Sequence, residues 1–359
     1  MRAILLNPGP VSLSEAVRKA AVSADLCHRE PEYFRLQSHV RSELLEVYAC
    51  DGAEWTAVLL GGSGTTALEA MLISLPARDA CLLVLENGVY GERIARIAEI
   101  HAIEHQALQF GWTEAIDFSR VEQALAEGGF THVAAVHHET TTGRLNDVGR
   151  LARLCEQHGV ELLLDAVSSF GAEAIPFDSP ALAGCAATAN KCLHGIPGLC
   201  FVVARRSALE QGAQPPRSLY LDLMLWAARQ DQESTPFTPP VNALLALDKA
   251  LEELRAQGGW QARHARYGRL AGRVRRGLAA RGVETMLPAE ASSCVLVSYR
   301  IPAGKPYAAI HDHLKQWGFV IYAGQGDLAA QLFRISTMGD ITDYDMERLL
   351  AAFESVFSA

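Results

Sequence analysis

The chain has 359 residues, of which 49% are hydrophobic and 20% are charged, and its formal net charge is −9. This length suggests two domains with an ample hydrophobic core, and the composition is ordinary for a globular enzyme. The acidic balance argues against a nucleic-acid partner or an anionic membrane surface, and no apolar run reaches the roughly 18 residues of a membrane span. The residues up to Pro10 show no signal-peptide pattern, so we expect a cytoplasmic protein without membrane association.

The first half of the chain predicts an α/β domain. The segment LLNPGPV at 5–11 indicates an extended arm, a helix is expected from about Ser14, and Pro31 opens a longer helix that reaches Tyr48. From residue 56, short apolar strands alternate with helical stretches. The strands are expected at 56–60, 81–86, 132–137, 160–166 and 198–204, and the helices at 65–75, 89–101 and 148–158. This alternation predicts a mostly parallel sheet with helices on both faces.

The C-terminal part of the chain has a different pattern. One long helical region is expected from Val241 to about Arg281. After it come a strand at 293–300, a helix from Tyr307, strands at 318–323 and 332–336, and a closing helix from Thr342. We therefore expect an N-terminal arm at 1–15, a large domain at 16–255 and a smaller α+β domain at 256–359.

The eight cysteines form no C-x-x-C pair, and several lie in apolar strands (Cys27, Cys50, Cys81, Cys155, Cys185, Cys192, Cys200, Cys294). Buried free thiols are the expected state.

Polar residues follow the predicted strands, and in doubly wound sheets ligands bind beyond the carboxyl ends of the strands. The first such segment, Gly61 to Thr66, joins a strand to a helix. Free amides at the helix N-terminus, together with Ser63 and Thr65 hydroxyls, would suit a single phosphate group. A nucleotide is less suited, because the segment matches neither GxxxxGK[ST] nor GxGxxG. The alternative is a tight turn capped by Ser or Thr.

The next two strand ends carry Tyr90 and the segment HHETTTG at 137–143. A tyrosine at this corner could lie over a flat ligand or pack in the core, and the core is the better interpretation for the residue alone. The His-His-Glu run does not favour a metal, because adjacent strand residues point to opposite sides. We expect no metal centre. The three threonine hydroxyls are better suited to hydrogen bonds with a ligand oxygen.

Asp165 ends the apolar strand VELLL, where a carboxylate needs a cationic partner such as a protonated pyridine nitrogen. The alternative is a turn or helix-cap aspartate.

Lys191 is the only Asp, Glu, Lys or Arg between Ser179 and Ala204, a run that predicts strand, turn and strand. The chain has 27 arginines and five lysines, so a lysine in this apolar stretch stands out. Unlike a guanidinium, a desolvated amine can lose its proton and attack a carbonyl. Lys191 is therefore either a Schiff-base lysine or a lysine whose head group reaches water.

Each feature is weak alone. Together they supply a phosphate cradle, a stacking ring, hydroxyl groups, a deep acid and a nucleophilic amine. Pyridoxal phosphate requires this set of groups.

The sequence resembles the class V, fold-type I aminotransferases that use pyridoxal phosphate, and within them the branch that acts on 2-aminoethylphosphonate. The matching segments run along nearly the whole chain: LLNPGPV at 5–11, DLCHREPEY at 25–33, GGSGTTALEA at 61–70, NGVYGER at 87–93, HHETTTGRLN at 137–146, DAVSSFG at 165–171, ANKCLHGIPG at 189–198, SLYLDL at 218–223, FTPP at 237–240, GFVIYAG at 318–324 and LFRIS at 332–336.

The resemblance implies a role for each matching residue. Lys191 would bind the cofactor covalently and then shuttle the substrate proton. Asp165 would hold the pyridine nitrogen protonated. Tyr90 would stack on the cofactor ring, and Thr141 would hydrogen-bond its phenolic oxygen. The cofactor phosphate would be bound by Ser63, Gly64, Thr65 and Asn190, and by Thr238 from the partner subunit. The substrate would be bound by Gly9, Arg29 and Arg334. Asn190 departs from the glutamine of related alanine–glyoxylate enzymes but could still donate to the phosphate.

The implied protein is a homodimer with shared active sites that moves an amino group from 2-aminoethylphosphonate to pyruvate. Three alternatives stay open: another donor, as in alanine:glyoxylate or serine:pyruvate aminotransferases, a lyase acting on a related aminophosphonate, and a binding module without catalysis. The presence of both Lys191 and Asp165 argues against the last. A cysteine desulfurase is disfavoured, because no cysteine lies in an evident mobile polar loop.

Overall fold

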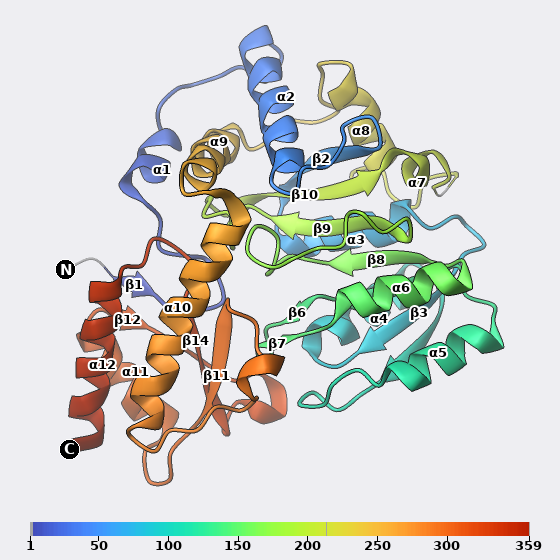
Figure 1. Ribbon diagram of the computed structural model, residues 1–359. Coiled ribbons are helices and arrows are strands. Elements are labelled where there is room, and N and C mark those ends of the chain that lie inside the picture. The colour runs from blue at the N-terminus through green and yellow to red at the C-terminus, as the bar shows by residue number, and fades with distance from the viewer. Residues whose placement is uncertain (1–2, 213, 359) are drawn as a thin grey trace.

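A computed structural model describes residues 3–212 and 214–358 and has a seven-stranded sheet at its centre (Figure 1). The strand order is β2-β10-β9-β8-β5-β3-β4. The strands are β2 (Trp55–Gly62), β3 (Cys81–Glu86), β4 (Glu104–Gln109), β5 (His132–Val136), β8 (Glu161–Asp165), β9 (Leu182–Thr188) and β10 (Gly198–Arg205). Only β10 is reversed, since it pairs antiparallel with both β2 and β9, while the pairs from β9 to β4 are parallel. The predicted α/β class and mostly parallel sheet are confirmed.

Helices cover both faces of this sheet, because its strands bury side chains on both sides. Along β5, Val133 and Ala135 belong to one core and Ala134 and Val136 to the other. The first core includes α2 (Pro31–Glu46), α5 (Phe118–Glu127), α6 (Val148–His158) and α9 (Val241–Ala256). The second includes α3 (Gly64–Ser74), α4 (Val89–Ile100), α7 (Arg206–Glu210) and α8 (Leu223–Asp231).

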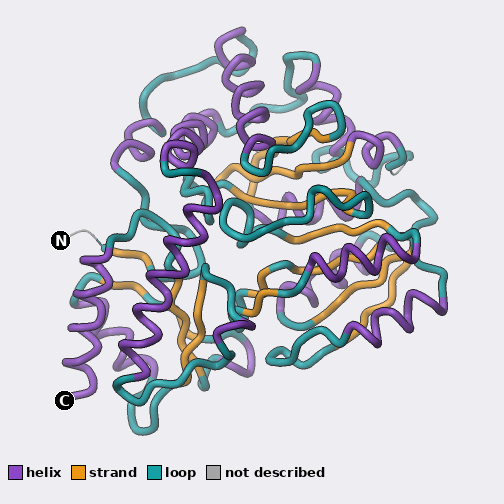
Figure 2. Tube along the Cα trace, in the orientation of Figure 1, coloured by secondary structure: helices purple, strands orange, loops and turns teal. Residues whose placement is uncertain are grey.

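A smaller antiparallel sheet has its own core. Its strand order is β11-β14-β13, and Figure 2 shows it as a group of strands separate from the large sheet. Its elements are β11 (Leu296–Arg300), β13 (Tyr322–Ala323), β14 (Leu332–Ser336), α10 (Gly259–Ala279), α11 (Tyr307–Gln316) and α12 (Asp343–Ser358).

The N-terminal arm joins this smaller unit. Strand β1 (Ile4–Leu5) pairs in parallel with β12 (Phe319–Val320), and the helix α1 (Glu15–Ala20) follows with Ser14 as its N-cap. The domain limits expected from the sequence stay a prediction. Residues 1 and 2 of the expected arm lie outside the described residues.

The long helical region expected from Val241 to about Arg281 is helical, but it is not continuous. The chain forms α9 and α10, which are separated at Gln257 and Gly258. Gly258 and Gly259 have φ values of +95° and +77°, a conformation that only glycine adopts readily. The helical periodicity of both segments conceals this break.

Several short elements were not anticipated. Strand β4 (EHQALQ) lies at the edge of the sheet and is largely polar, so no apolar run marks it. The two-residue strands β6 (His138–Glu139) and β7 (Arg144–Leu145) form a hairpin of their own. All eight cysteines are free; Cys155, Cys185, Cys192 and Cys200 are buried as expected, whereas Cys27 is exposed. Within the described ranges, no helix has the length and hydropathy needed to span a membrane.

Candidate active site

Lys191 and Asp165 lie at the same edge of the large sheet. Asp165 is the last residue of β8, and Lys191 lies in the short connection between β9 and β10. Because β10 runs back antiparallel beside β9, this connection stays at the carboxyl edge of the parallel strands. Both residues line a cavity of about 170 Å³, together with Ser63, Gly64, Thr65, Leu68, Tyr90, Arg93, Val167, Thr188 and Asn190.

The surroundings of Lys191 favour its neutral amine. Burial lowers the pKa of this lysine from 10.5 to about 8, and the positive charges of Arg334 and Arg93 act in the same direction. Asp165 opposes the shift but does not cancel it. A lysine with a pKa near 8 is about one-tenth deprotonated at pH 7, a nucleophilic fraction far larger than that of an exposed lysine.

The N-terminal arm covers Lys191. The ammonium group donates a hydrogen bond to the carbonyl oxygen of Pro8. A Cβ atom on Gly9, whose φ is +114°, would lie 2.8 Å from Cδ of the lysine. Only glycine therefore fits this close approach, and the predicted site residue Gly9 lies directly against the lysine. The arm is held at its other end by hydrogen bonds of Leu6 with Val320 and Ser336.

Asp165 is a buried carboxylate with little stabilisation from the protein. Its Oδ1 atom accepts one hydrogen bond, of 2.9 Å, from the amide of Val167. Burial raises its pKa from 3.8 to about 6, while the charges of Arg93 and Lys191 lower it. A cationic ligand group placed against this carboxylate would stabilise its charged form.

The turn before α3 is built for an anion. Ser63 caps the helix, its amide donates to Thr66 Oγ1 at 3.1 Å, and the first amides of a helix have no partner within it. Arg93 adds a positive charge to this turn. Its Nη1 donates a hydrogen bond to Thr65 Oγ1 at 3.2 Å, which holds the guanidinium beside the helix N-terminus. A Cβ atom on Gly64 would lie 2.5 Å from Val167, so the turn packs tightly against the loop that follows Asp165.

Arg93 was missed by sequence reasoning. It lies on α4 three residues after Tyr90, and its guanidinium stands 4.6 Å from the centre of the tyrosine ring. Residues three apart share a helix face, so the motif NGVYGER contained the signal. Tyr90 itself lines the cavity, as expected from its position at the strand end.

His138 was considered only as a metal ligand, yet it lines a small recess of the same site with Tyr90, Asp165, Ser168 and Lys191. Ser168 Oγ donates to the carbonyl of His138 at 2.9 Å and faces Nδ1 of the imidazole at 3.1 Å. These contacts favour the tautomer with the proton on Nδ1. Nε2 is then a buried acceptor with no hydrogen-bond partner among the described residues, and burial lowers the imidazole pKa to about 4.

Arg334 on β14 uses two of its three guanidinium nitrogens in hydrogen bonds with the protein. The side chain is buried, Nε donates to Ala323 O at 2.9 Å, and Nη1 donates to Thr140 O at 2.8 Å and Gln325 Oε1 at 3.1 Å. Nη2 has no hydrogen-bond partner among the described residues. Thr140 lines the recess beside Lys191, and the charge of Arg334 lowers the pKa of that lysine, so the guanidinium lies near the cavity although Arg334 is not among its lining residues.

The other predicted residues differ in position. Asn190 lines the cavity, and its Oδ1 accepts a hydrogen bond of 2.8 Å from Thr188. The Thr141 hydroxyl donates to Glu139 Oε1 at 2.5 Å and accepts from the Val89 amide, and Thr141 is not among the cavity-lining residues. Arg29 and Thr238 are exposed and lie outside the cavity of the single chain. Their proposed contacts stay predictions.

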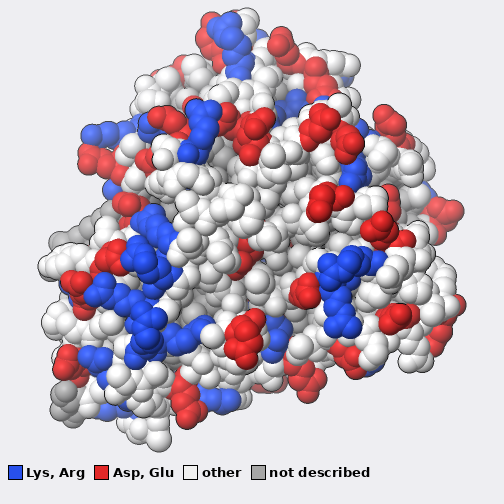
Figure 3. All heavy atoms as spheres, in the orientation of Figure 1, with Lys and Arg blue, Asp and Glu red and all other residues white. Residues whose placement is uncertain are grey.

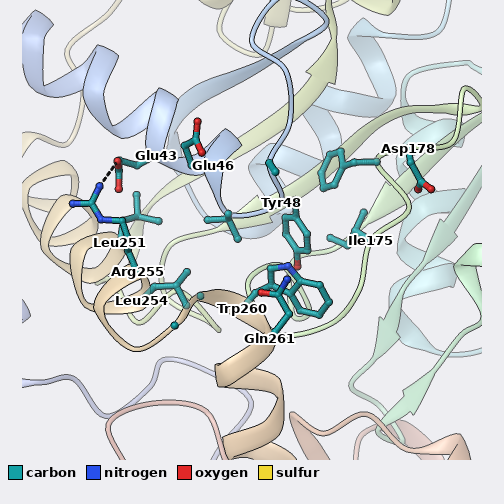
Figure 4. A pocket seen from close by; sticks show the side chains of 15 residues that line it. Glu43, Glu46, Tyr48, Ile175, Asp178, Leu251, Leu254, Arg255, Trp260 and Gln261 are labelled. Carbon is teal, nitrogen blue, oxygen red and sulfur yellow. Dashed lines mark hydrogen bonds and ion pairs between the residues drawn. The ribbon is translucent and has the colours of Figure 1, made fainter.

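A larger groove of about 610 Å³ lies elsewhere, between α2, α9 and the start of α10 (Figure 4). Its walls include Tyr48, Leu254 and Trp260, and an ion pair of 2.9 Å joins Glu43 and Arg255 across it. It contains no lysine, cysteine or histidine. The smaller cavity at Lys191 is therefore the candidate active site in spite of its size.

Comparison with known proteins decides the family. A family model described as aminotransferase class-V matches residues 22–332. The chain belongs to the class-V aminotransferases. Among curated members, it is 37% identical to the 2-aminoethylphosphonate–pyruvate transaminase of Phocaeicola vulgatus, with 98% of each chain covered. It is 40% identical to the transaminase of the same name from Syntrophobacter fumaroxidans, with 97% of this chain and 95% of the relative covered.

A solved aminotransferase structure shares the architecture. The crystal structure of a subgroup IV aspartate aminotransferase from Thermus thermophilus superposes with a TM-score of 0.89 at 28% identity, covering 99% of each chain. The fold-type I architecture expected for this class-V aminotransferase is thereby confirmed.

Proposed function

We propose that this class-V aminotransferase uses pyridoxal 5′-phosphate to transfer the amino group of 2-aminoethylphosphonate to pyruvate. The observation that carries the proposal is the pairing of a low-pKa Lys191 with a buried Asp165 in one cavity that adjoins the Ser63–Thr65 turn. The names of relatives that are 37% and 40% identical over nearly the whole chain support the choice of substrates.

The residues present fit the cofactor. The α3 turn with Arg93 suits its phosphate, the buried carboxylate of Asp165 suits a protonated ring nitrogen, and Tyr90 offers a flat surface for the ring. Nε2 of His138 is a buried acceptor that lacks a protein donor, which suits a polar ligand in the recess. When bound, the cofactor supplies a carbonyl that captures amines and a ring that withdraws electrons.

The chain's own residues then perform the proton transfers and the binding. Nζ of Lys191, whose pKa is lowered to about 8 by burial, would hold the cofactor through its carbonyl, and in its neutral form would take the proton from the donor carbon next to nitrogen. Asp165 stays ionised as long as a cation lies against it, and so holds the ring nitrogen protonated. The free Nη2 of Arg334 binds the acidic group of either substrate. The donor becomes phosphonoacetaldehyde and pyruvate becomes alanine.

A doubly charged phosphonate needs a second cation besides Arg334. Arg29 is exposed and lies outside this chain's cavity, so it can serve only where another subunit brings it there. Arg93 already lines the cavity, and its charge lowers the pKa of Asp165. Thr238 is exposed in the same way as Arg29, and the proposed homodimer would place it at the phosphate of the other subunit.

The deciding experiment follows alanine and aldehyde formation from 2-aminoethylphosphonate and pyruvate by the purified holoenzyme. Wild type and the control Lys249→Ala, at a partly exposed lysine outside the cavity, should turn over equally, and Lys191→Ala should be inactive. Brisk turnover of serine, or of alanine with glyoxylate, without aldehyde from the aminophosphonate would overturn the substrate assignment. Consumption of 2-aminoethylphosphonate without any keto acid would instead indicate a lyase.

A further inference from the structure

Three side chains from distant parts of the sequence meet away from the Lys191 cavity. Glu173 follows β8, His264 lies in the first turns of α10, and Cys294 precedes β11. One oxygen, nitrogen or sulfur atom from each lies within 4.8 Å of the other two. We propose that these three residues, with the carbonyl oxygen of Ala172, bind one Zn²⁺ ion. This proposal is independent of the proposed function.

The separations match a tetrahedral site. Nδ1 of His264 is 2.9 Å from Ala172 O, 3.1 Å from Glu173 Oε2 and 3.4 Å from Cys294 Sγ. Cys294 Sγ is 3.9 Å from Ala172 O. Zinc bonds of about 2.0–2.3 Å place neighbouring tetrahedral ligands roughly 3.3–3.8 Å apart. Shifts of a few tenths of an ångström would therefore bring these four separations into the range of a zinc site.

The cluster crowds three groups around one nitrogen. Ala172 O, Glu173 Oε2 and Cys294 Sγ lie within 3.4 Å of Nδ1 of His264, and the Cys294 thiol donates to Ala172 O. A divalent cation bound by a carboxylate, a neutral imidazole and a thiolate would be electrically balanced. Binding forms the metal–sulfur bond and releases the thiol proton to water, and it requires the imidazole to carry its proton on Nε2 so that Nδ1 is free to bind. The mixture of sulfur, nitrogen and oxygen ligands favours zinc over calcium or magnesium.

Hydrogen bonds from neighbouring residues hold the proposed ligand Glu173 in place. Glu173 Oε1 accepts from the Ser293 hydroxyl at 2.5 Å and from the Cys294 amide at 3.0 Å, which leaves Oε2 facing the cluster. Tyr48 fixes the loop from behind, because its hydroxyl donates to Glu173 O at 2.7 Å and accepts from the Gly171 amide at 2.9 Å. Figure 4 shows Tyr48 beside Trp260, near the start of α10. Such outer contacts are what orient metal ligands.

A metal could reach this cluster from solvent. The His264 side chain is 47% exposed, whereas that of Glu173 is 2% exposed. The bound ion would tie the loop after β8, in the large sheet, to α10 and to the chain entering β11, in the small sheet. The ligands are separated by many residues in the sequence, so no spacing motif announces them.

The test uses the untagged full-length holoenzyme, first treated with a chelator and then dialysed. Zn²⁺ is added, the protein is passed through a desalting column, and retained zinc is measured by mass spectrometry. Co²⁺ replaces Zn²⁺ in a second experiment, in which thiolate-to-cobalt absorption is read from difference spectra. The variants are Cys294→Ser and His264→Asn. Cys81→Ser, which alters a partly buried cysteine outside the cluster, is the matched control.

Wild type and Cys81→Ser should each retain one zinc per chain and show the thiolate absorption. Cys294→Ser should lose that absorption, and both cluster variants should bind zinc at least about tenfold more weakly. Circular dichroism confirms that the variants are folded. If the wild type retains no zinc, or if Cys294→Ser matches Cys81→Ser in both measurements, the proposal is wrong and the cluster is a hydrogen-bonded contact only.

Discussion

Lys191 is a better nucleophile than an ordinary lysine because burial lowers its pKa. Burial is the largest influence on its pKa, and two arginines act with it against Cys192 and Asp165. In the unfolded chain the pKa returns to the ordinary value near 10.5, so between pH 8 and 10.5 the unfolded state binds more protons. Stability therefore falls as the pH falls through this window and levels off below 8. The free energy of unfolding at neutral pH is therefore lower than it would be with an exposed lysine, and in return this amine loses its proton more readily.

This pKa can be measured without turnover. In the cofactor-free protein, the rate at which an amine reagent labels Lys191 should reach half its maximum near pH 8. The partly exposed Lys249 serves as an internal control, and its pKa is raised by hydrogen bonding to Glu252, so it should label only at higher pH. Peptide mass spectrometry resolves the two sites. Parallel pH profiles for both lysines would contradict the expectation.

Arg334 should not tolerate lysine. Nε and Nη1 are both used to hold the guanidinium in place, and only Nη2 is left for a ligand. A lysine ammonium cannot hold both positions and still present a fixed donor. We expect Arg334→Lys to raise KM at least about tenfold for both the amino donor and the keto acid, a loss of roughly one charged hydrogen bond. Steady-state kinetics of each half-reaction checks this, and an effect on pyruvate alone would refute a shared binding role.

Among single residues, the sequence predicted those that place a charge inside an apolar run. Lys191 and Asp165 could be selected because each is a charge in an apolar run. Arg93, His138 and the contact of Gly9 with Lys191 were not foreseen in these roles. Their roles depend on which segments the fold brings together, and a single strand or helix does not record that information.

Among the elements, α4 shows how closely a helix can approach the sheet. A Cβ atom on Gly91 would lie 2.8 Å from both Glu86 Cα and Leu85 O, which are backbone atoms that cannot rotate away. At Gly268 in α10, no described residue outside that stretch of helix has an atom within 4 Å of the same position.

Alanine at these two glycines should therefore have opposite effects. Gly91→Ala forces backbone apart and should destabilise the protein by about 1–3 kcal/mol. Gly268→Ala relieves only the low helix propensity of glycine and should stabilise it by up to about 1 kcal/mol. Thermal unfolding of the holoprotein measures both. A shift of the same sign in both variants would show that packing at Gly91 is not the cause.

Element prediction succeeded where burial is uniform. The runs that became β3, β5, β8 and β10 are continuously apolar, as expected for strands covered on both faces. The polar edge strand β4 and the break between α9 and α10 were missed. An edge strand needs no apolar face, and a glycine pair shows its backbone conformation only in the folded chain.

Over the whole molecule, charges of both signs are dispersed. Figure 3 shows basic side chains following α10 on the face displayed, and ion pairs from Arg269 and Arg273 to Asp343 and Glu347 join this helix to α12. The basic row therefore stabilises helix packing and is partly neutralised, which agrees with a small-molecule substrate better than with a nucleic acid.

The predicted homodimer can be tested at Thr238, which should affect cofactor binding only if it reaches the cavity of a second subunit. Thr238 is exposed and outside the cavity of its own chain, yet Thr238→Ala should weaken cofactor binding about tenfold, as expected for the loss of a hydrogen bond to a charged phosphate. Thr113→Ala, at another exposed threonine, is the control and should have no effect. Equilibrium dialysis measures the affinity, and sedimentation should give twice the chain mass of 38.9 kDa. An unchanged affinity for Thr238→Ala would exclude a shared site at this residue.

The arm from Ile4 to Pro10 has a practical consequence for anyone who prepares the protein. It enters as an added strand beside β12 and ends with its backbone on the lysine, so its path is fixed at both ends. Bulky fusions placed just before it would have to be accommodated beside the small sheet, and trimming it would uncover Lys191 to water. The C-terminal end of α12, which has no such connection to the lysine, is the better place for a purification tag or an immobilising linker (Figure 1).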